Sequence, residues 1–424
     1  MNLSQFSKIA LTTILATIGT AFGAMNTTSF PATDILKAHR EDVANEKLGN
    51  APRFAIVHNV SIAPLTTNEM TLENNNWVWR HQVKATNAVS LNFAFESFKM
   101  SQNSRVNIYS SDLSQNIRSF TASDNNIQNE LWTPVLLTEA AIVELVIPRN
   151  EIQDVRFELT RINQGYRNFS ETTEKSGSCN VDVVCTDGDD WADEINSVAV
   201  ISTGGSRFCT GFMVNNTLND KTPFFMTAKH CRISSSNASS LVTYWNYQKS
   251  SCEGRRNGKL NQFTTGSTFL AGSTKSDFTL VKLNGQPDDS YNVRYAGWDR
   301  SGEDASNAVA IHHPATDEKS ISFENDATTI TTYLREAIPG DGTHVRITDW
   351  DKGTTEPGSS GSPLFDQNHR VIGQLHGGYA SCSSQTSDWY GRFFTSWNGE
   401  GTDSTSLKNH LDSADTGDMF VDTL

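Results

Sequence analysis

The sequence has little positive charge, and its first 178 residues contain no cysteine. Of its 424 residues, 34 are Lys or Arg and 48 are Asp or Glu, which gives a formal net charge of −14. Proteins that bind phosphate backbones need clustered Lys and Arg, so this acidic balance argues against a nucleic-acid partner. All six cysteines lie between Cys179 and Cys382. Any disulfide or metal site that the cysteines form therefore lies in the second part of the chain.

Long apolar runs are also missing. Beyond the N-terminus, no stretch approaches the roughly 18 apolar residues that a membrane-spanning helix needs. The N-terminus itself has a positive Lys8, an interrupted apolar run over 9–18 and small residues at Ala21 and Gly23. This order is typical of a secretory signal peptide, which we assign to 1–23 with cleavage after Gly23. We therefore expect a secreted, monomeric protein without a membrane partner, in an oxidising compartment that permits up to three disulfides.

Short runs with alternating apolar residues recur along the whole chain. Such runs, rich in aromatic and β-branched residues, predict strands. In the first part strands are expected at 54–57, 77–83, 91–95, 106–109, 142–147 and 155–159. In the second part they are expected at 197–201, 209–214, 241–245, 278–283, 309–311, 344–347 and 371–375. A short helix is expected at 407–411, and long helices do not alternate with the strands, so the sequence predicts an all-β protein.

A polar stretch over 164–178 divides the chain and is predicted to be an exposed linker. The part of the chain that includes the start of this linker, 24–175, is predicted to be a β-rich, sandwich-like unit. After it, the cysteine-containing part forms a second unit. A structural metal is not expected in this part, because there is no C-x-x-C pair, and no cofactor is expected either.

Three short segments together indicate nucleophilic catalysis. They are 224–231, which contains His230, 275–283, which contains Asp277, and 358–363, which contains Ser360. Each alone has an ordinary structural explanation, as a strand end, a turn residue or a flexible Gly/Ser loop. Jointly they supply a serine, an imidazole to take its proton and a carboxylate to fix the imidazole tautomer.

The order His–Asp–Ser and the local motifs resemble chymotrypsin-like proteases. Thr227-Ala-Lys-His-Cys231 is similar to the segment of that family that carries the catalytic His, and Gly358-Ser-Ser-Gly-Ser-Pro363 is similar to its nucleophile loop. The resemblance narrows to the bacterial lysyl endopeptidases over 176–424. The segments that carry it are Ser176–Cys185, Val214–Thr217, Val242–Gln248, Ala296–Arg300, Ala310–Pro314, Gln374–Gly378 and Tyr390–Trp397.

This resemblance implies a chymotrypsin-like double β-barrel over 176–424, preceded by a β-rich propeptide. It implies a serine endopeptidase with His230, Asp277 and Ser360 as the triad, and with the N–H groups of Gly358 and Ser360 as the oxyanion hole. It also implies the disulfides Cys179–Cys382, Cys185–Cys252 and Cys209–Cys231. The residues alone leave 15 connectivities open.

The resemblance further implies cleavage after Lys. Thr354 stands where trypsin-like relatives carry their specificity carboxylate, and Asp388 is the residue that matches the lysyl endopeptidases. His376, Gly377 and Gly378 match the strand that binds the substrate backbone. Tyr333 is the best counterpart of a Trp that stacks on that His.

Several alternatives remain open at this point. A glutamyl endopeptidase would need a basic pocket wall, for which His344 could serve. A trypsin-like enzyme would accept Arg as well as Lys, and a non-catalytic secreted binding protein could use the same scaffold.

The partners expected from the preferred interpretation are Lys-containing peptides or proteins and the chain's own propeptide. Ser359 replaces the Asp that captures the new N-terminus in trypsin-like zymogens, so that activation switch is not expected. Instead, 24–175 is expected to assist folding and to occlude the site. It would be released by self-cleavage between Lys175 and Ser176.

Overall fold

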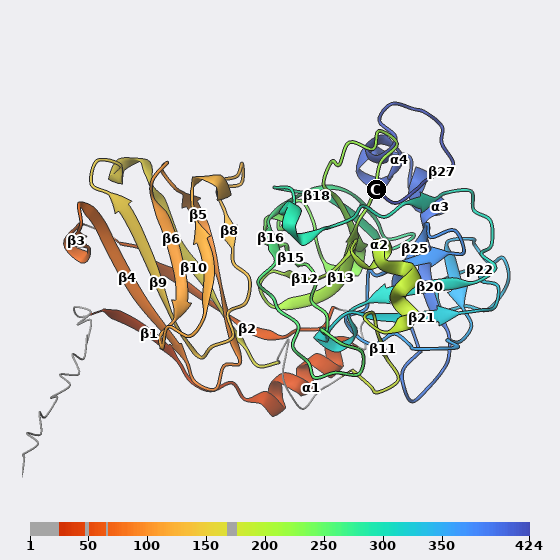
Figure 1. The fold of residues 1–424 in the computed structure, drawn as a ribbon, viewed down its shortest axis with the longest axis horizontal. Coiled ribbons are helices and arrows are strands. Elements are labelled where there is room, and N and C mark those ends of the chain that lie inside the picture. Colours follow the sequence, from red (N-terminus) through yellow and green to blue (C-terminus); the bar gives the residue numbers. More distant parts are fainter. Residues whose placement is uncertain (1–24, 47–50, 65–66, 168–175) are drawn as a thin grey trace, which may run out of the picture.

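The computed structural model describes residues 25–46, 51–64, 67–167 and 176–424. The expected signal peptide, 1–23, and Lys175 of the expected processing bond lie outside the described residues. Within the described ranges the strands form two sheets in each half of the chain, which confirms the all-β prediction. No helix in those ranges combines the length and the apolar character that crossing a membrane requires. Figure 1 shows the two halves side by side.

The N-terminal half is a sandwich of two sheets. One sheet has the order β1 (Asn26–Phe30), β4 (Asn76–Ala85), β9 (Ala140–Pro148), β6 (Arg105–Ser110) and β7 (Asn116–Phe120), with β3 (Thr71–Glu73) beside β4. The other has the order β2 (Ala55–Ile62), β10 (Arg156–Gly165), β5 (Ser90–Lys99) and β8 (Leu131–Trp132). In β4, Trp79, Val83 and Ala85 are buried while Arg80, Gln82 and Lys84 are less so, which is the origin of the period-two pattern.

The helix α1 (Ile35–Glu46) follows β1 and lies between the two halves in Figure 1. The strand-rich pattern of the sequence did not indicate it. Its apolar residues Ile35, Leu36 and Val43 are exposed, so no apolar stripe marks it as a helix that packs on a core.

Polar contacts hold α1 in place. Asp42 is 2% exposed and accepts hydrogen bonds from Arg53 Nε at 3.0 Å and from the hydroxyl of Tyr166 at 2.5 Å. Tyr166 belongs to the stretch 164–178 that was expected to be an exposed linker. That prediction is wrong for 164–166, because β10 continues through Gly165 and Tyr166 is buried against α1.

The second half consists of two barrel-like sheets, and the predicted chymotrypsin-like double β-barrel is confirmed. The first has the order β16 (Phe263–Thr265), β15 (Val242–Tyr244), β12 (Val198–Thr203), β13 (Arg207–Met213), β14 (Phe224–Ala228), β18 (Phe278–Leu283) and β17 (Ser267–Ser273). The second has the order β11 (Val181–Asp182), β21 (Ser320–Glu324), β20 (Ala308–His312), β24 (Pro363–Asp366), β25 (Val371–Gly378), β26 (Asp388–Arg392), β23 (His344–Ile347) and β22 (Thr329–Thr331). β19 (Trp298–Asp299) joins β25 to β27 (Phe420–Val421).

Short helices connect these strands. The α-helices of this half are α2 (Ala192–Ile195), α3 (Phe393–Asn398) and α4 (Lys408–Leu411), and α4 confirms the helix expected at 407–411. The 3-10 turns of the described chain are η1 (Thr67–Glu69), η2 (Ala122–Asp124), η3 (Ile152–Asp154), η4 (Thr186–Trp191), η5 (Lys229–Cys231), η6 (Ala238–Ser240), η7 (Asp289–Tyr291), η8 (Pro314–Thr316) and η9 (Asp403–Thr405).

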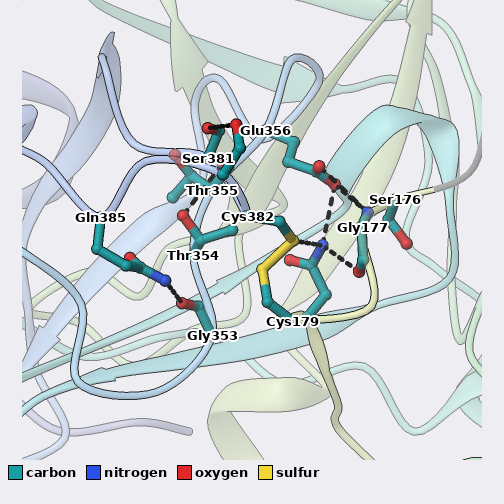
Figure 2. The surroundings of a disulfide bond; sticks show 12 residues. Ser176, Gly177, Cys179, Gly353, Thr354, Thr355, Glu356, Ser381, Cys382 and Gln385 are labelled. Atoms are coloured by element: carbon teal, nitrogen blue, oxygen red, sulfur yellow. Dashed lines mark hydrogen bonds between the residues drawn. A yellow bond between two sulfur atoms is a disulfide. The ribbon is translucent and has the colours of Figure 1, made fainter.

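Three disulfides cross-link the second half, and they are the pairs that the resemblance implies: Cys179–Cys382, Cys185–Cys252 and Cys209–Cys231. Figure 2 shows that Cys179–Cys382 ties the first described residues of this half to the loop after β25. Disulfides of this kind fit an extracellular protein.

The two halves also share a backbone pairing and a core. Residues 51–54 run antiparallel to the start of β13: the N–H of Phe54 donates to the carbonyl of Ser206 at 2.8 Å, and the N–H of Phe208 donates to the carbonyl of Pro52 at 3.1 Å. Tyr244 of β15 is buried in the same core cluster as the sandwich residues, and its hydroxyl accepts from the N–H of Val135 at 3.1 Å.

Removal of the long-range disulfide should destabilise the second half most. Cys179→Ala with Cys382→Ala opens a link between residues 203 apart, and Cys185→Ala with Cys252→Ala opens one of 67. We expect the first pair to lower the free energy of unfolding by about 2–5 kcal/mol, and by about 1 kcal/mol more than the second, because closure entropy grows with loop length. Urea unfolding followed by Trp fluorescence measures both losses. No loss from the first pair would contradict this expectation.

Candidate active site

His230 lies in η5, directly after the buried strand β14. The N–H of the preceding Lys229 donates to the carbonyl of Asp277 at 2.7 Å, and the following Cys231 is bonded to Cys209 of β13. The turn is thus fixed on both sides of the imidazole, and the side chain of His230 stays 17% exposed.

Asp277 immediately precedes β18 and makes two contacts with His230. Its Oδ2 lies 2.7 Å from His230 Nδ1, and its Oδ1 accepts from the backbone N–H of His230 at 3.0 Å. Its side chain is only 5% exposed. A carboxylate that binds both the ring and the backbone of one residue leaves the imidazole little freedom to rotate, and it directs Nε2 away from the carboxylate.

Gly358 to Ser362 form a tight loop before β24, and Thr210 of β13 holds it. The hydroxyl of Thr210 donates to the carbonyl of Gly358 and its N–H donates to the carbonyl of Ser360, both at 2.9 Å. Gly358 has φ +103°, and a Cβ there would lie 2.4 Å from the ring of Phe208, so only glycine fits. Within the described part of the chain, the N–H groups of Gly358 and Ser360 make no hydrogen bond.

The backbone of Ser360 lies beside the turn that carries His230. The carbonyl of Ser360 is 3.9 Å from Sγ of Cys231, the neighbour of His230. Among the described residues, Ser360 Oγ has no hydrogen-bond partner. Hydrogen bonds between catalytic groups are often long in the absence of substrate, and they shorten in the substrate complex.

Asp388, at the start of β26, is a buried carboxylate between β25 and β23. It is 1% exposed, and its Oδ2 accepts from Trp350 Nε1 at 2.9 Å and from the hydroxyl of Thr355 at 2.7 Å. Burial raises the pKa of Asp388 and these two hydrogen bonds oppose the rise. No Lys or Arg of the described residues lies within 4.0 Å of it.

Gly377 and Gly378 end β25 beside this carboxylate. A Cβ on Gly378 would lie 2.3 Å from Asp388 Oδ1, so a side chain at this position would block access to Asp388. Gly377 has φ +144° and lies near the hydroxyl of Tyr333. The two glycines thus leave the space between β25 and Asp388 open.

His376 precedes these glycines and lies between the rings of Tyr333 and His230. The Tyr333 ring is stacked on it with centroids 3.6 Å apart and planes 2° apart, and the His230 ring is 5.7 Å away. His376 Nε2 is 3.7 Å from Asp277 Oδ2. Burial lowers the pKa of His376 to about 4, so its ring is neutral near pH 7.

His344 of β23 is 2% exposed and lies against His376. Its Nε2 is 2.9 Å from His376 Nδ1, and burial lowers its pKa to about 3. Thr354, the position of the trypsin-like carboxylate, is fully buried. Ser359 lies with its hydroxyl 2.8 Å from Nδ1 of the buried His312.

Sequence reasoning did not identify the partners of these groups. Trp350 and Thr355 donate hydrogen bonds to Asp388. His344 is hydrogen-bonded to Thr343, which in turn donates to Asp341. Trp350 could have been noticed as a potential donor to a buried carboxylate. The others are common polar residues in loops, and no local signal sets them apart.

Among the described residues, two groups bring three possible metal-ligand side chains together. In the group Cys209, His230 and Cys231 the cysteines form a disulfide and offer no thiolate. In the group His230, Asp277 and His376 the ligand atoms lie within 4.8 Å of one another. A metal there would have to displace the 2.7 Å contact that orients the His230 ring.

The solved structures that match this chain are only distantly similar to it. The active form of a protease from M. tuberculosis is 13% identical with a TM-score of 0.34, and the match covers 52% of this chain and 88% of that one. A Glu endopeptidase in complex with MPD is 18% identical with a TM-score of 0.30, and the match covers 47% of this chain and 85% of that one.

Sequence comparisons are closer. A lysyl endopeptidase of Pseudomonas aeruginosa is 30% identical, and the match covers 74% of this chain and 72% of that protein. The family model for the C-terminal domain of lysyl endopeptidase matches residues 173–391. The chain therefore belongs to the lysyl endopeptidase family, and it is a serine endopeptidase.

Proposed function

We propose that this protein is a secreted endopeptidase that cleaves peptide bonds on the carboxyl side of Lys, with Ser360 as nucleophile. The observation that carries the catalytic part is the double contact of Asp277 with the ring and backbone of His230. It gives the imidazole the tautomer and orientation that proton transfer from a serine requires.

The proposed reaction proceeds through an acyl-enzyme. Ser360 Oγ attacks the carbonyl carbon and passes its proton to His230 Nε2, which then gives it to the leaving amine as the C–N bond breaks. Water, deprotonated by His230, hydrolyses the resulting ester and restores Ser360. The N–H groups of Gly358 and Ser360, whose carbonyls are tied to Thr210, are available to stabilise the oxyanion.

Ser360→Ala should abolish turnover of a Lys-containing peptide. We expect kcat to fall by roughly 10⁴- to 10⁶-fold, because no other group can form the acyl-enzyme. Ser362→Ala is the control, since its hydroxyl has no partner in the described chain. It should keep most of the activity. Steady-state kinetics provide the measurement, with the Ser360→Ala protein first cut by added parent enzyme that is then removed. Substantial turnover by the Ser360→Ala protein would refute the assignment.

Specificity for Lys is proposed to come from Asp388. A buried carboxylate without a cationic neighbour can pair with the ammonium group of a substrate Lys, and the bulkier planar guanidinium of Arg fits a pocket of fixed depth less well. The carboxylate of a substrate Glu would instead be repelled by the carboxylate of Asp388. The neutral His344 supplies no positive charge to bind it. The glutamyl alternative is therefore disfavoured.

Asp388→Asn should remove the preference for Lys. Loss of a buried charge partner costs about 2–5 kcal/mol, so kcat/KM for Lys substrates should fall by roughly 30- to 5,000-fold. Because Asp388 must be ionised to pair with Lys and burial raises its pKa, KM of the wild type should rise as pH falls, and the variant should lose this dependence. Asp349→Asn, at an exposed position, is the matched control.

The cleavage products of a denatured protein, mapped by mass spectrometry, test specificity independently. We expect cuts almost entirely after Lys. Frequent cuts after Arg would favour a trypsin-like specificity for both Lys and Arg, and cuts after Glu would overturn the proposal.

We also propose that residues 24–175 are a propeptide, released by cleavage between Lys175 and Ser176, and that 1–23 directs secretion. The pairing of 51–54 with the start of β13 supports occlusion, because Phe208 on that strand packs against Gly358. Residues 51–54 thus pair with the strand whose Phe208 ring lies against Gly358.

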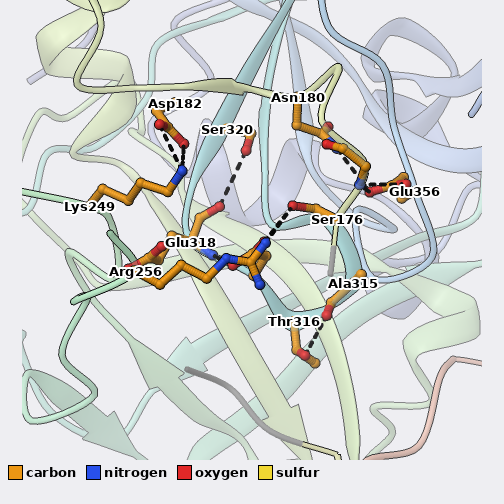
Figure 3. Close-up of polar contacts among 12 residues, drawn as sticks. Ser176, Asn180, Asp182, Lys249, Arg256, Ala315, Thr316, Glu318, Ser320 and Glu356 are labelled. Carbon is orange, nitrogen blue, oxygen red and sulfur yellow. Dashed lines mark hydrogen bonds and ion pairs between the residues drawn. The ribbon is translucent and has the colours of Figure 1, made fainter. Parts of the chain in front are cut away.

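The residues after the proposed bond are tied to the protease half. Figure 3 shows Ser176 beside Arg256, whose Nη2 is 3.4 Å from the Ser176 hydroxyl. The N–H of Gly177 donates to both oxygens of Glu356, at 3.1 and 3.0 Å, and Glu356 lies four residues before Ser360. These contacts would keep the new N-terminus in place after cleavage.

Lys175→Gln should block self-processing. We expect the full-length form to accumulate, as it should in Ser360→Ala, while Lys99→Gln at an exposed sandwich position is processed normally. Gel electrophoresis with N-terminal sequencing distinguishes the forms. A mature Lys175→Gln protein that starts at Ser176 would exclude self-cleavage at this bond by a Lys-specific enzyme.

A further inference from the structure

A row of polar groups extends from Asp277 of the proposed triad, beginning with His376. His376 is the extra residue of a β-bulge, since Leu375 and Gly377 pair with the consecutive residues Tyr390 and Trp389 of β26. A bulge redirects its side chain, and here the ring faces Asp277. Beyond His376 the row continues through His344 and Thr343 to Asp341.

The direction of the hydrogen bonds in this row follows from Asp341. Its Oδ1 lies 2.7 Å from the hydroxyl and 3.1 Å from the N–H of Thr343. Partial burial opposes ionisation, but the hydrogen bonds from Thr343 outweigh it and hold the pKa of Asp341 below its ordinary value. An ionised carboxylate only accepts, so the single hydroxyl hydrogen of Thr343 points at Asp341.

The two histidine tautomers are then determined. The Thr343 oxygen is 2.7 Å from His344 Nδ1, and because its own hydrogen is used, His344 must carry the hydrogen on Nδ1. The neutral His344 therefore has a bare Nε2, which accepts from His376 Nδ1 at 2.9 Å. The neutral His376 is left with a bare Nε2, 3.7 Å from Asp277 Oδ2.

We propose that Asp341, Thr343 and His344 are positioning residues that hold His376 in the Nδ1–H tautomer, so that Asp277 Oδ2 is reserved for His230. This inference rests on the proposed triad. In the other tautomer the Nε2–H of His376 would point at Asp277 Oδ2, 3.7 Å away, and compete for the charge that orients His230 and stabilises its imidazolium. The row thus keeps a second donor away from the catalytic carboxylate.

The titratable groups that face the two rings are few. Asp277 and His230 face His376, with the ring of Tyr333 stacked on it. Asp341, Asp277 and His376 face His344. Both rings are neutral near pH 7, so the tautomers, and not a change of charge, distinguish the two arrangements in that range.

Thr343→Val tests the proposal, because it keeps the branched shape and removes the oxygen. His344 then has no acceptor at Nδ1, moves its hydrogen to Nε2 and donates to His376 Nδ1, so that His376 must carry its own hydrogen on Nε2. Long-range ¹H–¹⁵N correlation of ¹⁵N-histidine-labelled full chain reports this directly. We expect Nδ1–H in the parent and Nε2–H in the variant, both in a Ser360→Ala background that prevents self-digestion.

Kinetics in the active background provide a second readout. With Asp277 shared, the imidazolium of His230 is less stabilised, so kcat should fall roughly 2- to 30-fold with KM little changed. The acid limb of kcat/KM should move to lower pH. Thr343→Ser restores the oxygen and should restore both values.

Thr331→Val is the matched control, because Thr331 is fully buried on the neighbouring strand and pairs with His344 without belonging to the row. It should leave the tautomer of His376 and the acid limb unchanged. An Nε2–H tautomer in the parent, or an unchanged tautomer in Thr343→Val, overturns the inference. Failure of the triad would appear separately, as turnover by the Ser360→Ala protein.

Discussion

The active-site region depends on one buried threonine that joins two sheets. Thr210 is fully buried, and its hydroxyl, N–H and carbonyl are all hydrogen-bonded. The hydroxyl donates to the carbonyl of Gly358 and accepts from the N–H of His313, the N–H donates to the carbonyl of Ser360, and the carbonyl accepts from Thr227. Because buried polar groups are costly to leave unpaired, the Gly358–Ser362 loop of one barrel cannot move without a penalty in the barrel that carries His230.

Features that depend on local pattern could be predicted from the sequence. The alternation in β4, the apolar runs of β9 and β14 and the Gly-rich loop at Gly358 each reflect the environment of their own segment. The positions of His230, Asp277 and Ser360 came from motifs and their order, and the structure places His230 against Asp277. Pairing of the cysteines came only from the family resemblance, because spacing alone leaves many connectivities open.

Features that depend on contacts between residues far apart in the sequence could not be predicted. Helix α1 is held by Asp42 against Arg53 and Tyr166, and its exposed apolar residues conceal it from a search for apolar periodicity. Trp350 reaches Asp388 across 38 residues, and His344 reaches His376 across 32. A bulge in β25 brings His376 into line with these groups, and nothing in the local sequence marks where a bulge will fall.

The shared core of the two halves has a consequence for how the protein is controlled. Phe208, Tyr244 and Phe263 of the protease half belong to the same apolar cluster as Phe54 and Phe120 of the sandwich. The proposed cleavage between Lys175 and Ser176 would remove none of these contacts, but it would turn contacts within one chain into contacts between two chains. Before the cut the sandwich is present at the effective concentration of a tethered ligand, and afterwards at its bulk concentration. With the proposed export and cleavage, dilution as well as proteolysis would determine how much enzyme is free of its own N-terminal half.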